Sequence, residues 1–215
     1  SEYEMQRYRL AEAHLMLKRE LRLPAGSDME ALAKYFEGSG DVASASEAYY
    51  IQGAYLNYIG ENTQAMQYLK KAENYPALSI IRGMTYYKMG RISESEQLYD
   101  IALENYQKAL PYLEEAGLPL YLASVYRELG RNTHNESRNQ YFDKALVAAR
   151  FMGDTILQMD IRYAQLSANQ DNSPELASIC QYMCHTAGQK RYAYDLVKYY
   201  IRTNKADSAR IYLDI

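Results

Sequence analysis

Small and large residues recur along the chain with the spacing of α-helices that pack against one another. Four segments carry a compact residue followed three positions later by a large one: Gly53–Leu56, Gly83–Tyr86, Ala123–Tyr126 and Val197–Tyr200. Seven residues after each compact residue comes a residue type that accepts left-handed backbone geometry, namely Gly60, Gly90, Gly130 and Asn204. The pattern predicts four helices that end at these four residues.

A second helix is expected after each of these ends, because small and large residues alternate there at helical spacing. The alternating residues are Ala65, Leu69 and Ala72, then Ser95, Tyr99 and Ala102, then Phe142 and Ala145. Three capping boxes, in which side chains satisfy the free amides of a first helical turn, predict helix starts. They are Ser27–Glu30, Ser93–Glu96 and Thr133–Glu136.

The remaining segments fit the same scheme of paired helices. Met5–Leu21 and Met29–Phe36 form one expected pair, closed by Gly38–Gly40. Ile156–Ala168 and Pro174–Ala187 form another, in which Ser173 before Pro174 is a start signal. No run of apolar residues alternates strictly enough to predict a strand. The chain is therefore predicted to be all-α, with six helix pairs.

The repeat has a short and regular period in its best-matched part. The interval from Gly53 to Gly83 is 30 residues, and Ala72 to Ala102 repeats it. This pattern resembles the tetratricopeptide repeat family, whose unit is about 34 residues long. The family's Trp is absent, and Glu104–Gly117 is longer than a repeat requires. The resemblance implies a right-handed α-α superhelix of about six TPR-like helix pairs, forming one domain over residues 1–215.

In the geometry of that family, the first helix of each pair faces an inner groove. Residues at fixed positions around each compact residue would line it, and the groove residues expected here are Tyr50, Asn57, Tyr58, Met84, Tyr87, Lys88, Arg127, Tyr194, Lys198 and Arg202. Four of them are cationic, whereas Glu128 is the single acid at these positions, so an acidic or C-terminal peptide is the expected partner. The lysine and asparagine arrangement with which related chaperone-binding arrays hold a peptide carboxylate is not reproduced. The alternative is that these residues simply face water.

Composition narrows the class of partner. The chain has 24 Tyr, 3 Phe and no Trp, and tyrosine suits half-buried helix faces because it joins a large ring to one hydroxyl. The formal charge of −3 and the even spread of Lys and Arg leave no basic block for a phosphate backbone, so direct nucleic-acid binding is not expected. No stretch reaches the roughly 18 apolar residues of a membrane helix, so membrane contact through this segment is not expected either.

No pattern in the sequence predicts chemistry. The eleven glycines are isolated turn markers, and no two of His14, His134 and His185 are four residues apart. Cys180, Cys184 and His185 resemble part of a metal site, but a closed zinc site needs about four ligands, and two buried cysteines with a surface histidine are the simpler interpretation. No catalytic residue, metal or cofactor is expected, and the chain is not expected to be an enzyme.

The expected function is a binding scaffold for a protein or peptide. The chain begins and ends inside helical patterns, and an exposed apolar face at Ile211, Leu213 and Ile215 would indicate that the natural chain continues. The family resemblance implies a bacterial sensor region of a larger signalling or regulatory protein, outside the cytoplasm and anchored through a segment absent from this chain. The alternative function is structural self-assembly or substrate capture at a cell surface.

Overall fold

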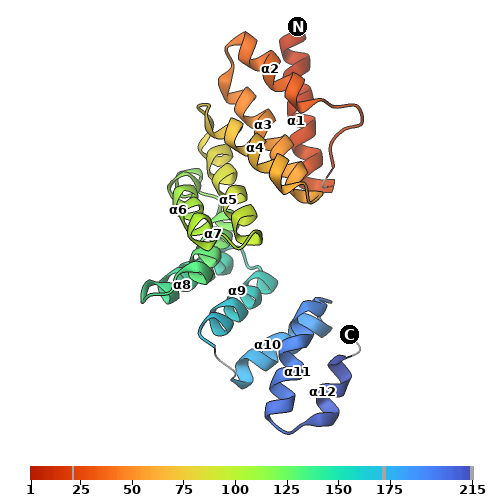
Figure 1. The fold of residues 1–215 in the computed structure, drawn as a ribbon, viewed down its shortest axis with the longest axis vertical. Coiled ribbons are helices and arrows are strands. Elements are labelled where there is room, and N and C mark those ends of the chain that lie inside the picture. Colours follow the sequence, from red (N-terminus) through yellow and green to blue (C-terminus); the bar gives the residue numbers. More distant parts are fainter. Residues whose placement is uncertain (21, 171–172, 214–215) are drawn as a thin grey trace. The chain divides into compact units, whose positions relative to one another are not determined.

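The computed structural model describes residues 1–20, 22–170 and 173–213, and over these residues the chain forms α-helices, one 3₁₀ turn and no strand. The helices are α1 (Glu2–Glu20), α2 (Met29–Ser39), α3 (Val42–Tyr58), α4 (Asn62–Glu73), α5 (Ser79–Ser95), α6 (Tyr99–Ala116), α7 (Pro119–Asn132), α8 (Ser137–Phe151), α9 (Thr155–Ala168), α10 (Pro174–His185), α11 (Ala193–Arg202) and α12 (Ala206–Leu213). The 3₁₀ turn η1 covers Lys190–Tyr192. The predicted all-α class and the predicted pairing of helices are confirmed (Figure 1).

The helices form two compact units. Unit 1 covers Ser1–Tyr121 and unit 2 covers Leu122–Ile215, so the boundary falls within α7. The single domain expected over residues 1–215 stays a prediction.

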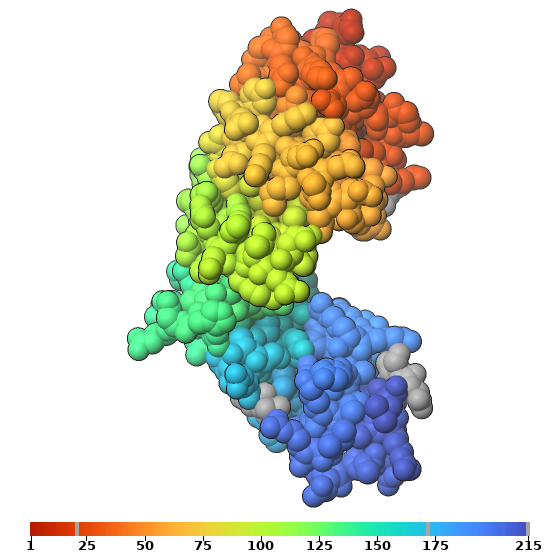
Figure 2. Space-filling model, in the orientation of Figure 1, coloured from red at the N-terminus to blue at the C-terminus, as the bar shows by residue number. Residues whose placement is uncertain are grey.

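In unit 1 each helix packs on the next one along the chain from α2 to α6, and the first helices α1, α3 and α5 also contact one another in order. Figure 2 shows the segments of this unit following one another in chain order over the surface, from red to lime. Because α1, α3 and α5 are neighbours, their side chains share one face of the unit. This shared surface is called here the first-helix face.

Small residues lie where two helices of a pair approach most closely. A Cβ atom added at Gly53 would stand 2.8 Å from Cγ of Leu69 on α4. A Cβ atom added at Gly83 would stand 2.6 Å from Cγ of Leu113 on α6. Both glycines therefore let a leucine of the second helix lie directly on the backbone of the first, as the repeat pattern predicts.

Two of the four predicted helix ends are correct. Gly60 follows α3 with φ +89° and Asn204 follows α11 with φ +55°. Gly90 and Gly130, in contrast, lie inside α5 and α7, which continue to Ser95 and Asn132, so their prediction as terminators was wrong. The reason is packing: an added Cβ would stand 2.6 Å from the Tyr106 ring at Gly90 and 3.0 Å from the Phe142 ring at Gly130.

The three predicted capping boxes do not start helices as expected, whereas the start predicted at Ser173 is correct. Asp28, and not Ser27, caps α2, because its carboxylate accepts from the amide of Ala31 at 2.9 Å. Ser93 is buried inside α5. The box at Thr133 is also not used, since α8 begins at Ser137 without a side-chain cap. Ser173 does cap α10, accepting from the amide of Leu176.

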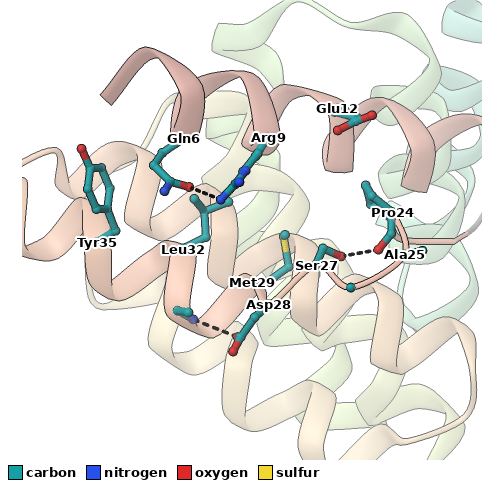
Figure 3. Close-up of a pocket in the computed structure, with 12 residues that line it drawn as sticks. Gln6, Arg9, Glu12, Pro24, Ala25, Ser27, Asp28, Met29, Leu32 and Tyr35 are labelled. Carbon is teal, nitrogen blue, oxygen red and sulfur yellow. Dashed lines mark hydrogen bonds between the residues drawn. The ribbon is translucent and has the colours of Figure 1, made fainter. Parts of the chain in front are cut away.

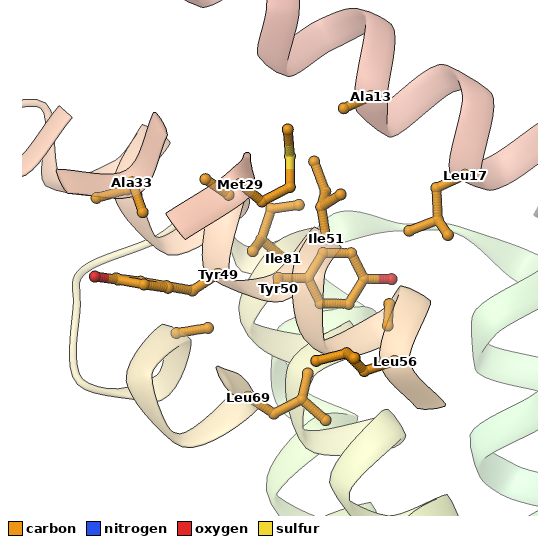
Figure 4. Close-up of a cluster of buried hydrophobic side chains, with 14 of the residues drawn as sticks. Ala13, Leu17, Met29, Ala33, Tyr49, Tyr50, Ile51, Leu56, Leu69 and Ile81 are labelled. Carbon is orange, nitrogen blue, oxygen red and sulfur yellow. The ribbon is translucent and has the colours of Figure 1, made fainter. Parts of the chain in front are cut away.

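Each unit buries its own apolar core. Figure 4 shows the core of unit 1, in which Tyr49 and Tyr50 leave α3 in opposite directions. Tyr49 lies against the rings of Tyr68 and Tyr75, whereas the ring of Tyr50 lies 6.3 Å from that of His14 on α1. Adjacent residues on one helix thus supply the interior of a repeat and the first-helix face. The core of unit 2 gathers around side chains that include Ile179, Cys180, Met183, Tyr192, Leu196 and Tyr212.

Two further predictions concern an exposed apolar face near the C-terminus and the absence of a membrane-spanning helix. On α12 the side chains of Ile211 and Leu213 are exposed, as expected for an uncovered apolar face. Ile215 and the predicted helix end at Leu21 lie outside the described residues. No helix in the described part of the chain is long and apolar enough to cross a membrane.

Tyrosine hydroxyls donate repeatedly to carboxylates in unit 1, and Glu30 shows the consequence. Tyr68 donates to Glu30 at 2.6 Å, while Lys71 and Lys34 lie 3.2 and 3.3 Å from it. The hydroxyl of Tyr68, followed by the two ammonium groups, lowers the pKa of Glu30 from 4.5 to about 2. Glu30 therefore links α2 to α4 in its charged form.

A lowered pKa in the folded state means that the charged form stabilises folding above the unfolded pKa. We expect the difference in unfolding free energy between wild type and Glu30→Gln to be constant above pH 4.5 and to shrink as the pH falls towards about 2. Urea denaturation of both proteins across this range measures it. A difference that does not change with pH would contradict the role of the charge.

Candidate functional site

A pocket of about 300 Å³ opens on the first-helix face of unit 1. Three helices and the start of α7 line it, with the residues His14, Leu17, Lys18, Tyr50, Ala54, Asn57, Tyr58, Met84, Lys88 and Tyr121. Five of the ten groove residues predicted from the sequence border this one pocket. They are Tyr50, Asn57, Tyr58, Met84 and Lys88.

The pocket has an apolar wall. Leu17, Tyr50 and Ala54 are buried there, and Met84 is half-buried beside them. The hydroxyl of Tyr50 lies 3.7 Å from Sδ of Met84, and burial raises the pKa of Tyr50, so its ring stays a neutral phenol. Aromatic and thioether groups together form a surface that adapts to apolar ligand groups of different shape.

The positively charged side chain of Lys88 lies at this apolar wall. It is half-buried, and within the described part of the chain its ammonium group has no ion-pair partner. Burial, and next the charge of Arg91, lower the pKa of Lys88, which means that the protonated form is held in unfavourable surroundings. Lys18, also without an ion-pair partner among the described residues, stands exposed at the rim. An anion placed between these two ammonium groups would relieve that cost.

Hydroxyl and amide groups complete the rim. His14 is bonded to Glu47 at 2.6 Å, and Asn57 donates to Asn62 at 3.0 Å, so both are held in place from outside the pocket. Tyr58 is 55% exposed and Tyr121 is half-buried, with its pKa raised by burial. The two phenols can donate or accept hydrogen bonds next to the lysines.

The comparisons with known proteins address the fold. No family model matches the chain, and no curated protein matches it. Among solved structures, aspartyl phosphate phosphatase F from Bacillus subtilis has a TM-score of 0.63 at 13% identity over 98% of this chain. BtubC from P. vanneervenii has a TM-score of 0.62 at 13% identity, over 97% of this chain and 88% of its own length. The fold is a helical repeat. The chain spans 58% of the length of the phosphatase structure.

The other predicted groove residues lie elsewhere. Tyr87 is on α5 but packs against the ring of Tyr106, at 5.9 Å between centroids, and does not border the pocket. Arg127, Tyr194, Lys198 and Arg202 belong to unit 2. There Lys198 lies 4.0 Å above the ring of Tyr194 and 3.7 Å from Asp195, while Arg202 is exposed.

Arg127 proves to be part of the interior of unit 2. Its side chain is only 16% exposed and bonds to the carboxylates of Asp160 and of the fully buried Glu128. Asp160 also accepts from Arg191 and from the hydroxyl of Tyr192. The count of charges in the sequence omitted Asp160 and Asp195, which pair with two of the four predicted groove cations.

The sequence pattern also missed residues that do border the pocket. His14 and Lys18 are one turn apart on α1. This helix carries the compact Ala13, but the residue seven positions later is Glu20 and not a glycine or asparagine, so the repeat pattern did not select it. Tyr121 stands two residues before the compact Ala123. The i, i+4 spacing of His14 and Lys18 on the first predicted helix could have indicated that both lie on one face.

A second pocket in unit 1 lacks a half-buried cation. It measures about 380 Å³ and lies between α1, the start of α2 and residues 24–28 (Figure 3). Three of its polar groups are already bonded: Arg9 to Gln6, Ser27 to the carbonyl of Pro24, and Asp28 to the amide of Ala31. Glu12 and Tyr35 also line it, but its one cation, Arg9, is exposed, so it does not hold a cation in desolvating surroundings as the first pocket does.

The cysteine pair has no features of a reactive or metal-binding site. Burial raises the pKa of Cys180 to about 12 and also raises the pKa of Cys184, so both are neutral thiols near pH 7. His185 is bonded to the hydroxyl of Tyr212 at 2.7 Å. Over residues 1–20, 22–170 and 173–213, no three His, Cys, Asp or Glu side chains are grouped to hold a metal ion.

Proposed function

We propose that this chain is a non-enzymatic, TPR-like binding scaffold of bacterial type, and that unit 1 holds a segment of a protein partner on its first-helix face. The observation that carries the proposal is the half-buried Lys88, without an ion-pair partner among the described residues, at an apolar wall on that face. The proposed partner segment is an extended peptide with an acidic group next to an apolar side chain.

The chemistry of the pocket supports that choice of segment. A carboxylate bonded to Lys88 would form a charge-assisted hydrogen bond, worth about 1.5–3 kcal/mol where one partner is already desolvated. An apolar side chain of the peptide would lie on Met84 and the ring of Tyr50. The hydroxyls of Tyr58 and Tyr121 would bond to the peptide backbone.

The wider role is proposed on the same basis. A scaffold of this size would act as the recognition region of a larger bacterial signalling or regulatory protein, since helix repeats supply an extended surface and no reacting group is needed. Structural self-assembly is the second candidate, and the exposed apolar side chains of α8 favour it.

The test is a selection followed by titration. The 215-residue chain is used to select peptides from a displayed random library, and the selected peptides are titrated by calorimetry against wild type, Lys88→Met and Lys70→Met. Lys70 is exposed on the second helix α4 of the same unit, so its variant removes one charge from unit 1 away from the pocket.

We expect the selected peptides to be rich in Asp and Glu. We expect Lys88→Met to weaken their binding by roughly tenfold to a hundredfold, which corresponds to the loss of one charge-assisted bond. Lys70→Met should bind as wild type does. Peptides without acidic residues, or equal affinity for wild type and Lys88→Met, would contradict the proposal.

A further inference from the structure

Unit 2 exposes two large apolar side chains one turn apart on α8. Val147 is 65% exposed and Phe151 is 82% exposed. The chain has three phenylalanines, and the other two, Phe36 and Phe142, are fully buried. Phenylalanine has no polar atom that could bond to water, so the two side chains form an apolar patch without a partner on this helix. Val147 and Phe151 are called here the α8 ridge.

A groove lies beside the ridge, on the same unit. It has a volume of about 640 Å³ and is lined by α8, α9 and α10. Its apolar lining comes from Leu146, Met159, Ile179 and Tyr182. Because α9 contacts both α8 and α10, the groove runs between two second helices. It is called here the α8–α10 groove, and its volume exceeds that of the unit 1 pocket.

The rim of this groove carries both signs of charge. The guanidinium of Arg150 has no ion-pair partner among the described residues, and it stands on the same helix as the exposed Asp143. Asp143 accepts a long hydrogen bond, 3.5 Å from Nε2 of Gln165. Arg162 and Glu175 farther along the rim neutralise each other through bonds of 2.7 and 2.9 Å.

A surface that binds its own copy about a two-fold axis must be complementary to itself, and a projection, a cavity and charges of both signs in one patch meet this condition. Unit 2 offers all of these around α8. We propose that this chain forms a symmetric dimer in which the α8 ridge of each copy fills the α8–α10 groove of the other. Arg150 of one copy would then face Asp143 of the other copy. This inference concerns unit 2 and does not depend on the peptide site of unit 1.

A second copy is favoured over an unrelated partner by this self-complementarity of shape and charge. The contact rests on one aromatic and one aliphatic side chain from each copy, so it belongs with the small interfaces of less than about 1,200 Å² that associate weakly. We therefore expect dimerisation with a Kd on the order of 10 µM.

Sedimentation equilibrium of the 215-residue chain tests the proposal. The proteins compared are wild type, Phe151→Ser, which removes the ridge, Ser178→Arg, which fills the groove from an exposed position, and Ile211→Ser. Ile211 is 63% exposed on α12, so the last variant removes a similar apolar side chain of the same unit outside the proposed interface. Circular dichroism of each variant checks that it is folded.

We expect wild type and Ile211→Ser to show the same monomer–dimer equilibrium, and Phe151→Ser and Ser178→Arg each to raise the Kd at least tenfold. An equimolar mixture of the two weakened variants should associate more tightly than either variant alone, because the mixed dimer keeps one intact ridge–groove contact. A wild type that stays monomeric up to about ten times the expected Kd, or folded Phe151→Ser that dimerises as wild type does, would overturn the proposal.

Discussion

Replacing Gly83 with leucine is expected to destabilise unit 1 by about 3 kcal/mol. A Cβ atom at this position would stand 2.6 and 2.7 Å from Cγ and Cδ2 of Leu113, and 3.3 Å from the backbone nitrogen of the same residue. Rotation of Leu113 cannot relieve the last contact, so α5 and α6 would have to separate. The loss should appear as a lower midpoint in urea denaturation followed by circular dichroism.

Gly38 provides the matched control for this substitution. It lies in α2 with nothing within 4 Å of an added Cβ atom, and its φ is not in the left-handed region. Gly38→Leu should leave stability unchanged or raise it slightly, because Gly38 is exposed and leucine favours a helix over glycine. An unchanged midpoint for Gly83→Leu would mean that the two helices do not pack as described.

Arg127→Met is expected to destabilise unit 2 by roughly 3–5 kcal/mol. Arg127 donates to Glu128 at 2.6 and 3.2 Å, and the side chain of Glu128 is fully buried. Arg127 also bonds to Asp160, so the substitution would remove a charge that compensates two carboxylates in the interior. Leaving these carboxylates under-compensated is costly because water cannot reach Glu128 and reaches Asp160 only in part.

Arg150→Met serves as the control, because its guanidinium has no ion-pair partner among the described residues and is exposed. Chemical denaturation of the two variants at a concentration where the chain is monomeric separates the effects. Equal stability of Arg127→Met and Arg150→Met would contradict the structural role of Arg127. The same role means that Arg127 is unsuited to test ligand binding, although its sequence position placed it in the groove.

The helix pairs could be predicted from the sequence because their packing leaves a local trace. Compact residues recur where helices approach, and Gly53 and Gly83 do lie against leucines of the second helix. The ends were harder to predict, because glycine serves both for helix termination and for close approach. Gly90 and Gly60 occupy the same place in the repeat, yet Gly90 lies inside α5, where its missing side chain makes room for the ring of Tyr106 on the next helix.

The candidate site was predictable in part for a similar reason. Residues at fixed positions on α3 and α5 come together, so Tyr50, Met84 and Lys88 could be named from spacing alone. The carboxylate of Asp160 could not, because it lies on α9, whereas its partner Arg127 lies on α7. Asp195 stands three residues before Lys198 on α11, so that pair could have been inferred from the i, i+3 spacing. The long-range neighbour Asp160 is what distinguishes the paired Arg127 from Lys88.

Hydrogen exchange of the 215-residue chain, with and without a selected acidic peptide, tests the central claim most directly. Binding slows the local opening of the elements that contact a ligand. We expect slower exchange in the parts of α1, α3 and α5 around His14–Lys18, Tyr50–Tyr58 and Met84–Lys88 in wild type, and clearly less slowing in Lys88→Met at the same peptide concentration. Slower exchange confined to the second helices α4 and α6, or to α11 and α12, would contradict the assignment of the first-helix face as the binding site.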